Sequence, residues 1–243
     1  MNYAWNWGVL AQNPYMQWLI SGVELTSAIS LAALVIAVGV GTAVGVVHSA
    51  HTPVGRILTG IYINVFRNIP LLLQMFLWFF VVPEIVPAGM GRWLKRDLPF
   101  PEIMTAIVAL GLFTSARIAV QVSAGIDAVP VGQRWAARAT GLSPLQAYRL
   151  VLLPQAVRII IPPLTSEFLT IFKNSSLALT IGVYELTAQT QQIQSITYQG
   201  FEAFTAATVI YVTIALAVTL LMRRIEVRAT LPSFVSGGGR DRT

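Results

Sequence analysis

The sequence contains few charged residues and no cysteine. Asp, Glu, Lys and Arg make up 11% of the 243 residues, whereas hydrophobic residues make up 55% and the mean hydropathy is +0.68. Soluble domains carry roughly 25% charged residues, so this chain has too little charge to cover a water-facing surface. The lack of cysteine excludes disulfides and thiol chemistry. The composition is therefore that of a polytopic membrane protein.

Three other functional classes lack their signals. The net charge of +6 comes from 16 basic residues spread over the whole chain, so no segment predicts a nucleic-acid-binding surface. Neither lysine, Lys95 or Lys173, completes a G-x-x-x-x-G-K phosphate loop, and no residues have metal-ligand spacing. We therefore expect no cofactor, metal or catalytic residue in this chain. Active transport would need energy from another chain or from an ion gradient.

Five apolar runs are long enough to cross a bilayer. No β-strand pattern and no repeat of fixed period is present, so we expect an all-α fold. The connections between the runs are more polar, and the longest of them covers about 127–149. Together the runs form a five-helix domain over 18–222. The expected spans are about 18–47, 57–82, 102–126, 150–172 and 201–222.

The distribution of basic residues predicts the orientation in the membrane. Five spans put the two termini on opposite sides. With the N-terminus outside, the inner segments hold nine basic residues and the outer segments hold four. Basic residues gather on the cytoplasmic side, so we expect segment 1–17 outside and the loop 127–149 and basic tail 223–243 inside. The part of the tail that begins at Val227 is expected to be disordered.

Arg117 stands in the middle of the third run. Thr114, Arg117 and Gln121 are spaced i, i+3 and i+7, and so form a narrow polar stripe on an apolar helix. An ionised residue in a span costs at least about 2.5 kcal/mol, so it usually faces protein or a water-filled pathway. Two interpretations stay open. Arg117 either binds an anionic group of a substrate, or is a structural arginine tied to backbone carbonyls or to a carboxylate on a neighbouring helix.

Prolines interrupt two further runs. In the second run Pro70 removes a backbone donor, and Arg67 is expected near the inner interface. The fourth run holds Pro154, Pro162 and Pro163, and we expect it to be the most broken span. Broken helices expose backbone groups to a substrate, so this span is a candidate for the substrate pathway. The alternative is that its helix simply ends near residue 172 and that Lys173 lies at the outer headgroups. The candidate pathway residues here are Ser166, Glu167, Lys173, Asn174, Ser175 and Ser176, and Ser166, Thr170 and Lys173 are expected to share a face.

The loop 127–149 predicts two short helices. Gly141 would end the first, and Ser143 would cap the second, with Pro144 in its first position. The loop is either a solvated basic connection or a docking helix for a cytoplasmic partner, which small alanines would let approach closely. The candidate docking residues are Arg134, Trp135, Ala136, Ala137, Arg138, Gly141 and Leu142.

Several of these segments, in this order and spacing, resemble the permeases of ABC importers for polar amino acids. The loop with Ala136-Ala137 and Gly141 is similar to their EAA loop. The other matching segments are 66–74, 153–156, 162–163, 173–176 and 181–186. Within the family, segments 5–8, 113–117 and 163–167 are similar to glutamate/aspartate importer permeases. Two departures are that Trp135 replaces the usual glutamate of the loop, and that Val120 and Ser123 stand where many relatives carry an acidic and a basic residue.

The resemblance implies a type I importer permease in a bacterial inner membrane, surrounded by lipid. Its implied partners are a second, similar permease, a periplasmic binding protein that delivers the amino acid, and two ATPase subunits that bind the inner loops, ATP and Mg. Arg117 would then pair with a carboxylate of glutamate or aspartate. Alternatives are a permease for a neutral or other polar amino acid, an ion-driven transporter that uses Glu167, and a membrane scaffold that transports nothing.

Overall fold

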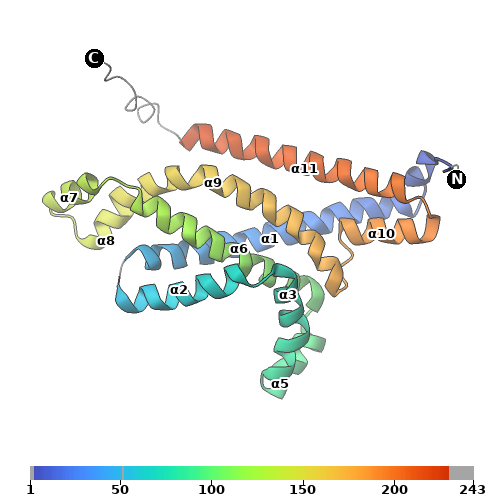
Figure 1. Cartoon of the computed structure of the whole chain (residues 1–243), viewed down its shortest axis with the longest axis horizontal. Coiled ribbons are helices and arrows are strands. Elements are labelled where there is room, and N and C mark those ends of the chain that lie inside the picture. Colours follow the sequence, from blue (N-terminus) through green and yellow to red (C-terminus); the bar gives the residue numbers. More distant parts are fainter. Residues whose placement is uncertain (1–2, 51, 230–243) are drawn as a thin grey trace, which may run out of the picture.

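The computed structural model describes residues 3–50 and 52–229, and the described residues form helices without any strand (Figure 1). The expected all-α fold is therefore confirmed. Residues 227–229 belong to the last helix, and the remainder of the expected disordered tail lies outside the described residues. The long helices are α1 (Tyr15–Ser49), α2 (Pro53–Asn68), α6 (Pro101–Asp127), α9 (Leu153–Asn174) and α11 (Gly200–Ala229).

Shorter helices connect the long ones. Those between α2 and α6 form an arm that projects sideways from the bundle (Figure 1). Within this arm, residues 92–96 are helical and belong to α5 and η3. The short helices are η1 (Trp7–Ala11), α3 (Leu71–Phe76), η2 (Leu77–Val81), α4 (Val82–Ile85), α5 (Ala88–Arg92), η3 (Trp93–Asp97), α7 (Val131–Ala139), α8 (Pro144–Ala147), η4 (Tyr148–Leu152), η5 (Ser175–Ile181) and α10 (Leu186–Thr197).

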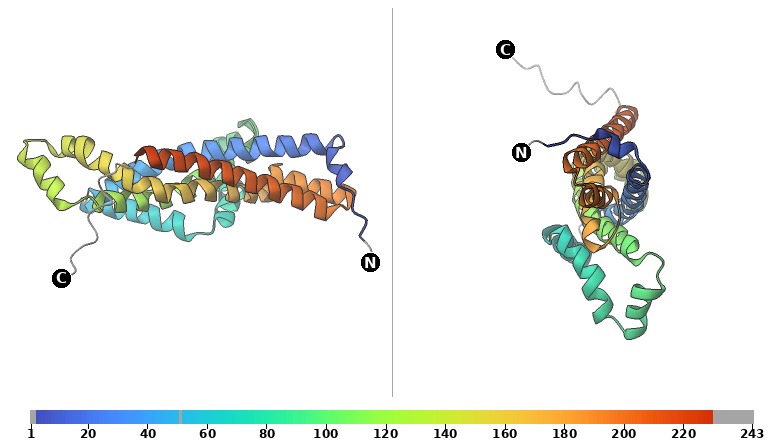
Figure 2. Two further views of the ribbon diagram at one scale, coloured as in Figure 1. Left: turned by 90° about the horizontal axis from the view of Figure 1, so that it is seen from above. Right: turned by 90° about the vertical axis from the view of Figure 1, so that its right-hand side faces the viewer.

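The described helices provide four membrane spans, or five, the expected number, if one bent helix counts as a span. Four are long and apolar enough to cross a bilayer: α1, α6, the run Pro144–Ile181, which contains α9, and α11. The fifth would consist of α2 and the helical run Leu71–Ile85, which are bent by 103° relative to each other. The α7–α8 hairpin projects from one end of the bundle, and the N-terminal segment and α10 lie at the other end (Figure 2).

The most broken span is the second and not the fourth, so that expectation was wrong. α9 continues through Pro162 and Pro163, packed against both α6 and α11. In the second span, Ile69 and Pro70 are extended and separate α2 from α3. The residue before a proline is disfavoured in the helical region, so the chain turns there. Arg67 is exposed in the last turn of α2, beside this bend, and its depth in the bilayer stays a prediction.

The core is built around a close contact between α1 and α6. Small residues recur every four positions along α1, and a Cβ atom placed on Gly41 or Gly45 would lie within 2.8 Å of α6 atoms. Small side chains let two helix backbones approach closely, which strengthens packing where lipid gives no hydrophobic driving force. This contact fixes α6, and therefore Arg117, against the rest of the bundle.

Candidate functional site

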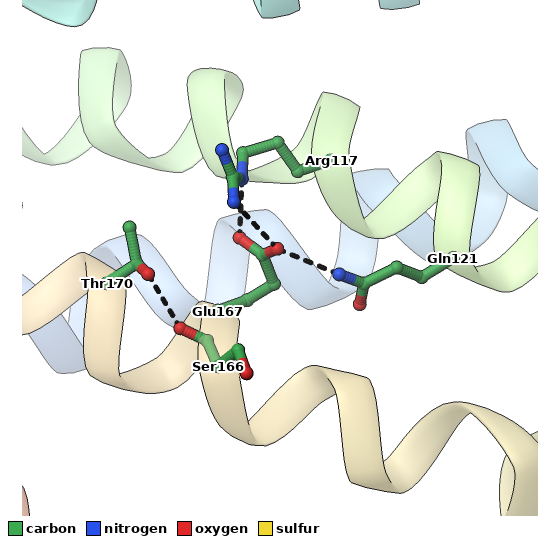
Figure 3. Close-up of polar contacts among 5 residues, drawn as sticks. All are labelled: Arg117, Gln121, Ser166, Glu167 and Thr170. Carbon is green, nitrogen blue, oxygen red and sulfur yellow. Dashed lines mark hydrogen bonds and ion pairs between the residues drawn. The ribbon is translucent and has the colours of Figure 1, made fainter.

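Two of the three residues of the polar stripe on α6 converge on one carboxylate of α9. The Nε atom of Arg117 donates to Oε2 of Glu167 at 2.7 Å, and its Nη2 donates to Oε1 at 3.2 Å. Gln121 Nε2 also donates to Oε1, at 2.8 Å (Figure 3). Bidentate arginine–carboxylate pairs are strong and directional. The geometry shows the carboxylate on a neighbouring helix that the structural interpretation of Arg117 requires, and leaves substrate binding by the same side chain as a proposal.

The two charges of the pair differ in exposure. The Glu167 side chain is 4% exposed and enclosed by the bundle, whereas the Arg117 side chain is 40% exposed. The guanidinium has five N–H donors, and two of them serve Glu167. Thr114 is buried next to this face, and its hydroxyl has no hydrogen-bond partner within the described part of the chain. The site is therefore an ion pair without net charge, in which the arginine is partly exposed and the glutamate is buried.

The candidate residues farther along α9 are not part of this pair. Ser166 and Lys173 are exposed and Thr170 is half-buried, so the expected shared face exists, and the Thr170 hydroxyl donates to the Ser166 carbonyl. Lys173 follows Glu167 by six residues, which puts it on a different side of the helix. It lines a groove of about 330 Å³ between α9 and α11.

The four residues 173–176 differ among themselves. Asn174 is half-buried, whereas Ser175 is fully buried and its hydroxyl donates to the carbonyl of Phe172. The Ser176 hydroxyl donates to the carbonyl of Lys173. Both serines therefore support the transition from α9 to η5, and Lys173 is the most exposed group of the set.

A second buried carboxylate, Glu185, has no place in the predicted site. It is fully buried, and Oε1 accepts the backbone N–H of Ala188 at 2.9 Å, which caps α10. Oε2 accepts the hydroxyl of Tyr211 at 2.9 Å and that of Thr26 at 3.4 Å. Glu185 thereby joins α1, α10 and α11. In the sequence, Glu185 is the one charged residue of segment 181–186, which is also one of the segments that resemble the permease family.

The loop at the opposite end has the predicted local structure. Gly141 has a φ of +79°, and the N–H groups of Gly141 and Leu142 donate to the carbonyls of Arg138 and Ala137, which is a Schellman ending of α7. Ser143 and Gln146 form a reciprocal capping box at the start of α8. The two expected helix boundaries are confirmed.

The docking candidates on α7 are mostly exposed. Trp135 is 65% exposed, and Ala136 and Arg138 are also exposed, whereas Ala137 is buried. Leu142 is half-buried in the turn that follows. Tryptophan is enriched among the residues that contribute most to binding at protein interfaces, so the exposed Trp135 favours the docking interpretation, which stays a prediction. Over residues 3–50 and 52–229, three or more metal-ligating side chains do not come together anywhere.

Comparison with known proteins places the chain among transport proteins. The chain is 40% identical to the glutamate/aspartate import permease protein GltJ of Escherichia coli (strain K12), over 98% of this chain and 100% of that protein. It is 30% identical to the glutamate/aspartate import permease protein GltK of Escherichia coli O6:H1, over 91% and 99% of the two chains. The probable glutamine ABC transporter permease protein GlnP of Bacillus subtilis is 31% identical over 89% of this chain and 95% of its own length.

Solved structures have the same fold. A crystal structure of an amino acid ABC transporter with histidines superposes with a TM-score of 0.77 at 30% identity, covering 94% of this chain and all of the other. The MetNI methionine ABC transporter in an inward-facing conformation gives 0.73 at 23% identity, over 90% and 100% of the chains. The family model of binding-protein-dependent transport systems matches residues 35–231. The chain therefore belongs to the family of inner membrane components of binding-protein-dependent transport systems.

Proposed function

We propose that the chain is the permease subunit of an ATP-driven importer for acidic amino acids, glutamate or aspartate. The observation that carries this proposal is the 40% identity to a glutamate/aspartate import permease over the full length of both chains. Arg117 supports an acidic substrate. It offers a cation within a membrane span, where a substrate carboxylate without a partner would be costly. ATP and Mg would be bound by separate ATPase subunits.

Arg117 and Glu167 together suit both ends of an amino acid. A substrate carboxylate would approach the exposed side of the Arg117 guanidinium, and the substrate ammonium would be received by Glu167. In the structure the two side chains neutralise each other, so neither charge is left unpaired in the absence of substrate. Thr114 and Gln121 lie on the same stripe and would line the same pathway. Ser166, Lys173, Asn174, Ser175 and Ser176 are weaker candidates, for the outer gate.

The proposed partners follow from the family. A second, similar but distinct permease is suggested by the existence of two glutamate/aspartate import permeases, both related to this chain. The two ATPase subunits would bind the α7–α8 loop, through residues 134–138, 141 and 142. A binding protein would deliver the amino acid at the N-terminal end, which is outside in the predicted orientation. ATP binding would pull the two loops together and open the pathway outward, and hydrolysis would restore the inward-facing state.

Uptake of labelled glutamate by cells lacking this chain tests the proposal. Wild type is expected to restore uptake, and Arg117→Ala is expected to abolish it at equal membrane abundance and with the ATPase still co-purifying. Arg67→Ala, which removes an exposed arginine at the bend of the second span, is the matched control and should retain uptake. If wild type restores uptake of neither glutamate nor aspartate with its partners present, the acidic substrate is wrong.

The likeness to a probable glutamine permease favours one alternative, a neutral polar amino acid. A panel of labelled amino acids in the same cells distinguishes the two substrates. An ion-driven transporter would retain uptake when the ATPase is deleted.

A further inference from the structure

The N-terminal segment 3–8 is fastened to the start of α11, a feature that transport does not explain. Glu202 is fully buried, and its carboxylate accepts the hydroxyl of Tyr3 and, at 2.7 Å, the backbone N–H of Asn6. Hydrogen bonds to a charged group are stronger than those between neutral groups. Glu202 therefore holds the segment that precedes α1 against the first turn of α11.

This attachment gathers exposed aromatic rings at one end of the bundle. The rings of Trp5 and Trp7 are stacked, with centroids 6.1 Å apart, and Tyr3 contacts Trp5 edge-on at 5.0 Å. Phe201 of α11 joins them at 4.8 Å from Tyr3. Trp5, Trp7 and Phe201 are each more than half exposed. Tryptophan and tyrosine are enriched where a membrane meets water, because their rings are apolar at one edge and polar at the other.

A groove of about 530 Å³ lies beside these rings, between the N-terminal segment, α10 and α11. Its polarity changes along its length. Polar groups of Tyr3, Gln194 and Tyr198 lie at the start of α11. Deeper along that helix the lining alternates between the apolar Phe204 and Val209 and two threonines, of which Thr208 donates its hydroxyl to a backbone carbonyl of the same helix. Among the described residues that line it, none carries a charge. The lining residues are Tyr3, Gln194, Tyr198, Gly200, Phe201, Phe204, Thr205, Thr208 and Val209.

The deeper end of the groove continues along the exposed side of a membrane span. Val212, Leu216 and Leu220 follow at helical spacing, and each is more than half exposed. Arg223 and Arg224 end this apolar surface, about 33 Å from Phe201 at 1.5 Å per residue. This length matches the hydrocarbon core of a bilayer. The polar end of the groove thus lies at one membrane surface and its apolar end points into the bilayer.

We propose that this groove binds a single phospholipid of the leaflet at the N-terminal end of the bundle. The glycerol and headgroup region would lie against Tyr3, Gln194 and Tyr198, and an acyl chain would follow Phe204 and Val209 along α11. The direction of the polarity change is that of a phospholipid in this leaflet. A soluble protein partner fits less well, because the groove opens along the exposed side of a membrane span.

The test is to count phospholipids retained by the intact importer, purified in mild detergent, by native mass spectrometry. Thr205→Phe places a bulky side chain in the groove at an exposed position. Thr180→Phe makes the same change at an exposed position of η5, outside the groove lining and outside α11, and is the matched control. Wild type and Thr180→Phe are expected to retain one phospholipid per chain, and Thr205→Phe is expected to lose it. Equal retention by all three overturns the proposal.

A second measurement does not depend on filling the groove. In nanodiscs of phospholipids brominated near the glycerol end of the acyl chains, the fluorescence of Trp5 and Trp7 is expected to be quenched. The contribution of these two is obtained by difference from the variant Trp5→Phe/Trp7→Phe. If their fluorescence is insensitive to brominated lipid and instead changes when the binding protein is added, the surface binds protein and the proposal is wrong.

Discussion

Gln74 on α3 donates from Nε2 to the backbone carbonyl of Phe66 on α2 at 2.7 Å, across the bend of the second span. The same amide donates to the carbonyl of Ile69 at 2.8 Å. The last carbonyls of a helix have no partner within it, and in a membrane such groups must be satisfied by protein or water. One side chain, 4% exposed, therefore satisfies two of the carbonyl groups at the turn before Pro70.

Replacing this amide is expected to destabilise the bend. Gln74→Leu keeps the approximate size of the side chain but leaves two enclosed carbonyls without donors, at a cost of about 1–3 kcal/mol. The measurement is the thermal unfolding of the purified complex in detergent. Gln191→Leu, at an exposed position of α10, serves as the control and should unfold like wild type. Equal unfolding of both variants would show that water satisfies these carbonyls instead.

The contact between α1 and α6 predicts that alanine substitutions at two glycines of α1 change the stability of the protein in different ways. A Cβ on Gly41 would lie 2.8 Å from Ile118 Cβ and from the Ser115 carbonyl oxygen, whereas nothing lies within 4 Å of one on Gly39. We expect Gly41→Ala to lower stability by about 1–3 kcal/mol, since backbone must move. Gly39→Ala should be neutral or stabilising by up to about 1 kcal/mol, through helix propensity.

Chemical denaturation of the complex in detergent measures both alanine variants under the same conditions. A Gly41→Ala protein as stable as Gly39→Ala would mean that α1 and α6 shift apart without loss, and that close packing of their backbones does not hold the core together.

The Schellman turn of the docking loop predicts a local effect on dynamics. Gly141 has a φ of +79°, and alanine in this left-handed region costs about 1–2 kcal/mol. Gly141→Ala is expected to speed hydrogen exchange over residues 131–147 by roughly tenfold, because the strain lowers the free energy of local opening by about 1–2 kcal/mol. Gly132→Ala, in the first turn of α7 with open space around it, should slow exchange or leave it unchanged. Equal rates in the two variants would contradict the role of Gly141 in holding the loop.

The sequence alone was sufficient where the relevant physics is local. Composition and the length of apolar runs identified a five-span membrane protein, since every span must bury its own backbone hydrogen bonds in lipid. Gly141 and Ser143 marked the helix boundaries of the α7–α8 loop, because a cap depends only on neighbours a few positions away. The i, i+3 and i+7 spacing of Thr114, Arg117 and Gln121 marked the polar stripe on α6, because helical periodicity is also a local property.

The tertiary structure decided which groups meet. Arg117 and Glu167 are fifty positions apart, and the sequence left open whether the arginine was structural. The number of prolines predicted the wrong span as the most broken one. α9 packs against α6 and α11 and stays helical through Pro162 and Pro163, whereas Pro70 lies at the turn between α2 and α3. Glu185 gains its hydrogen-bond partners from three separate helices. Pairing of this kind depends on how helices pack. The small residues repeated every four positions along α1 favour close approach of another helix, but only the tertiary structure shows that this helix is α6.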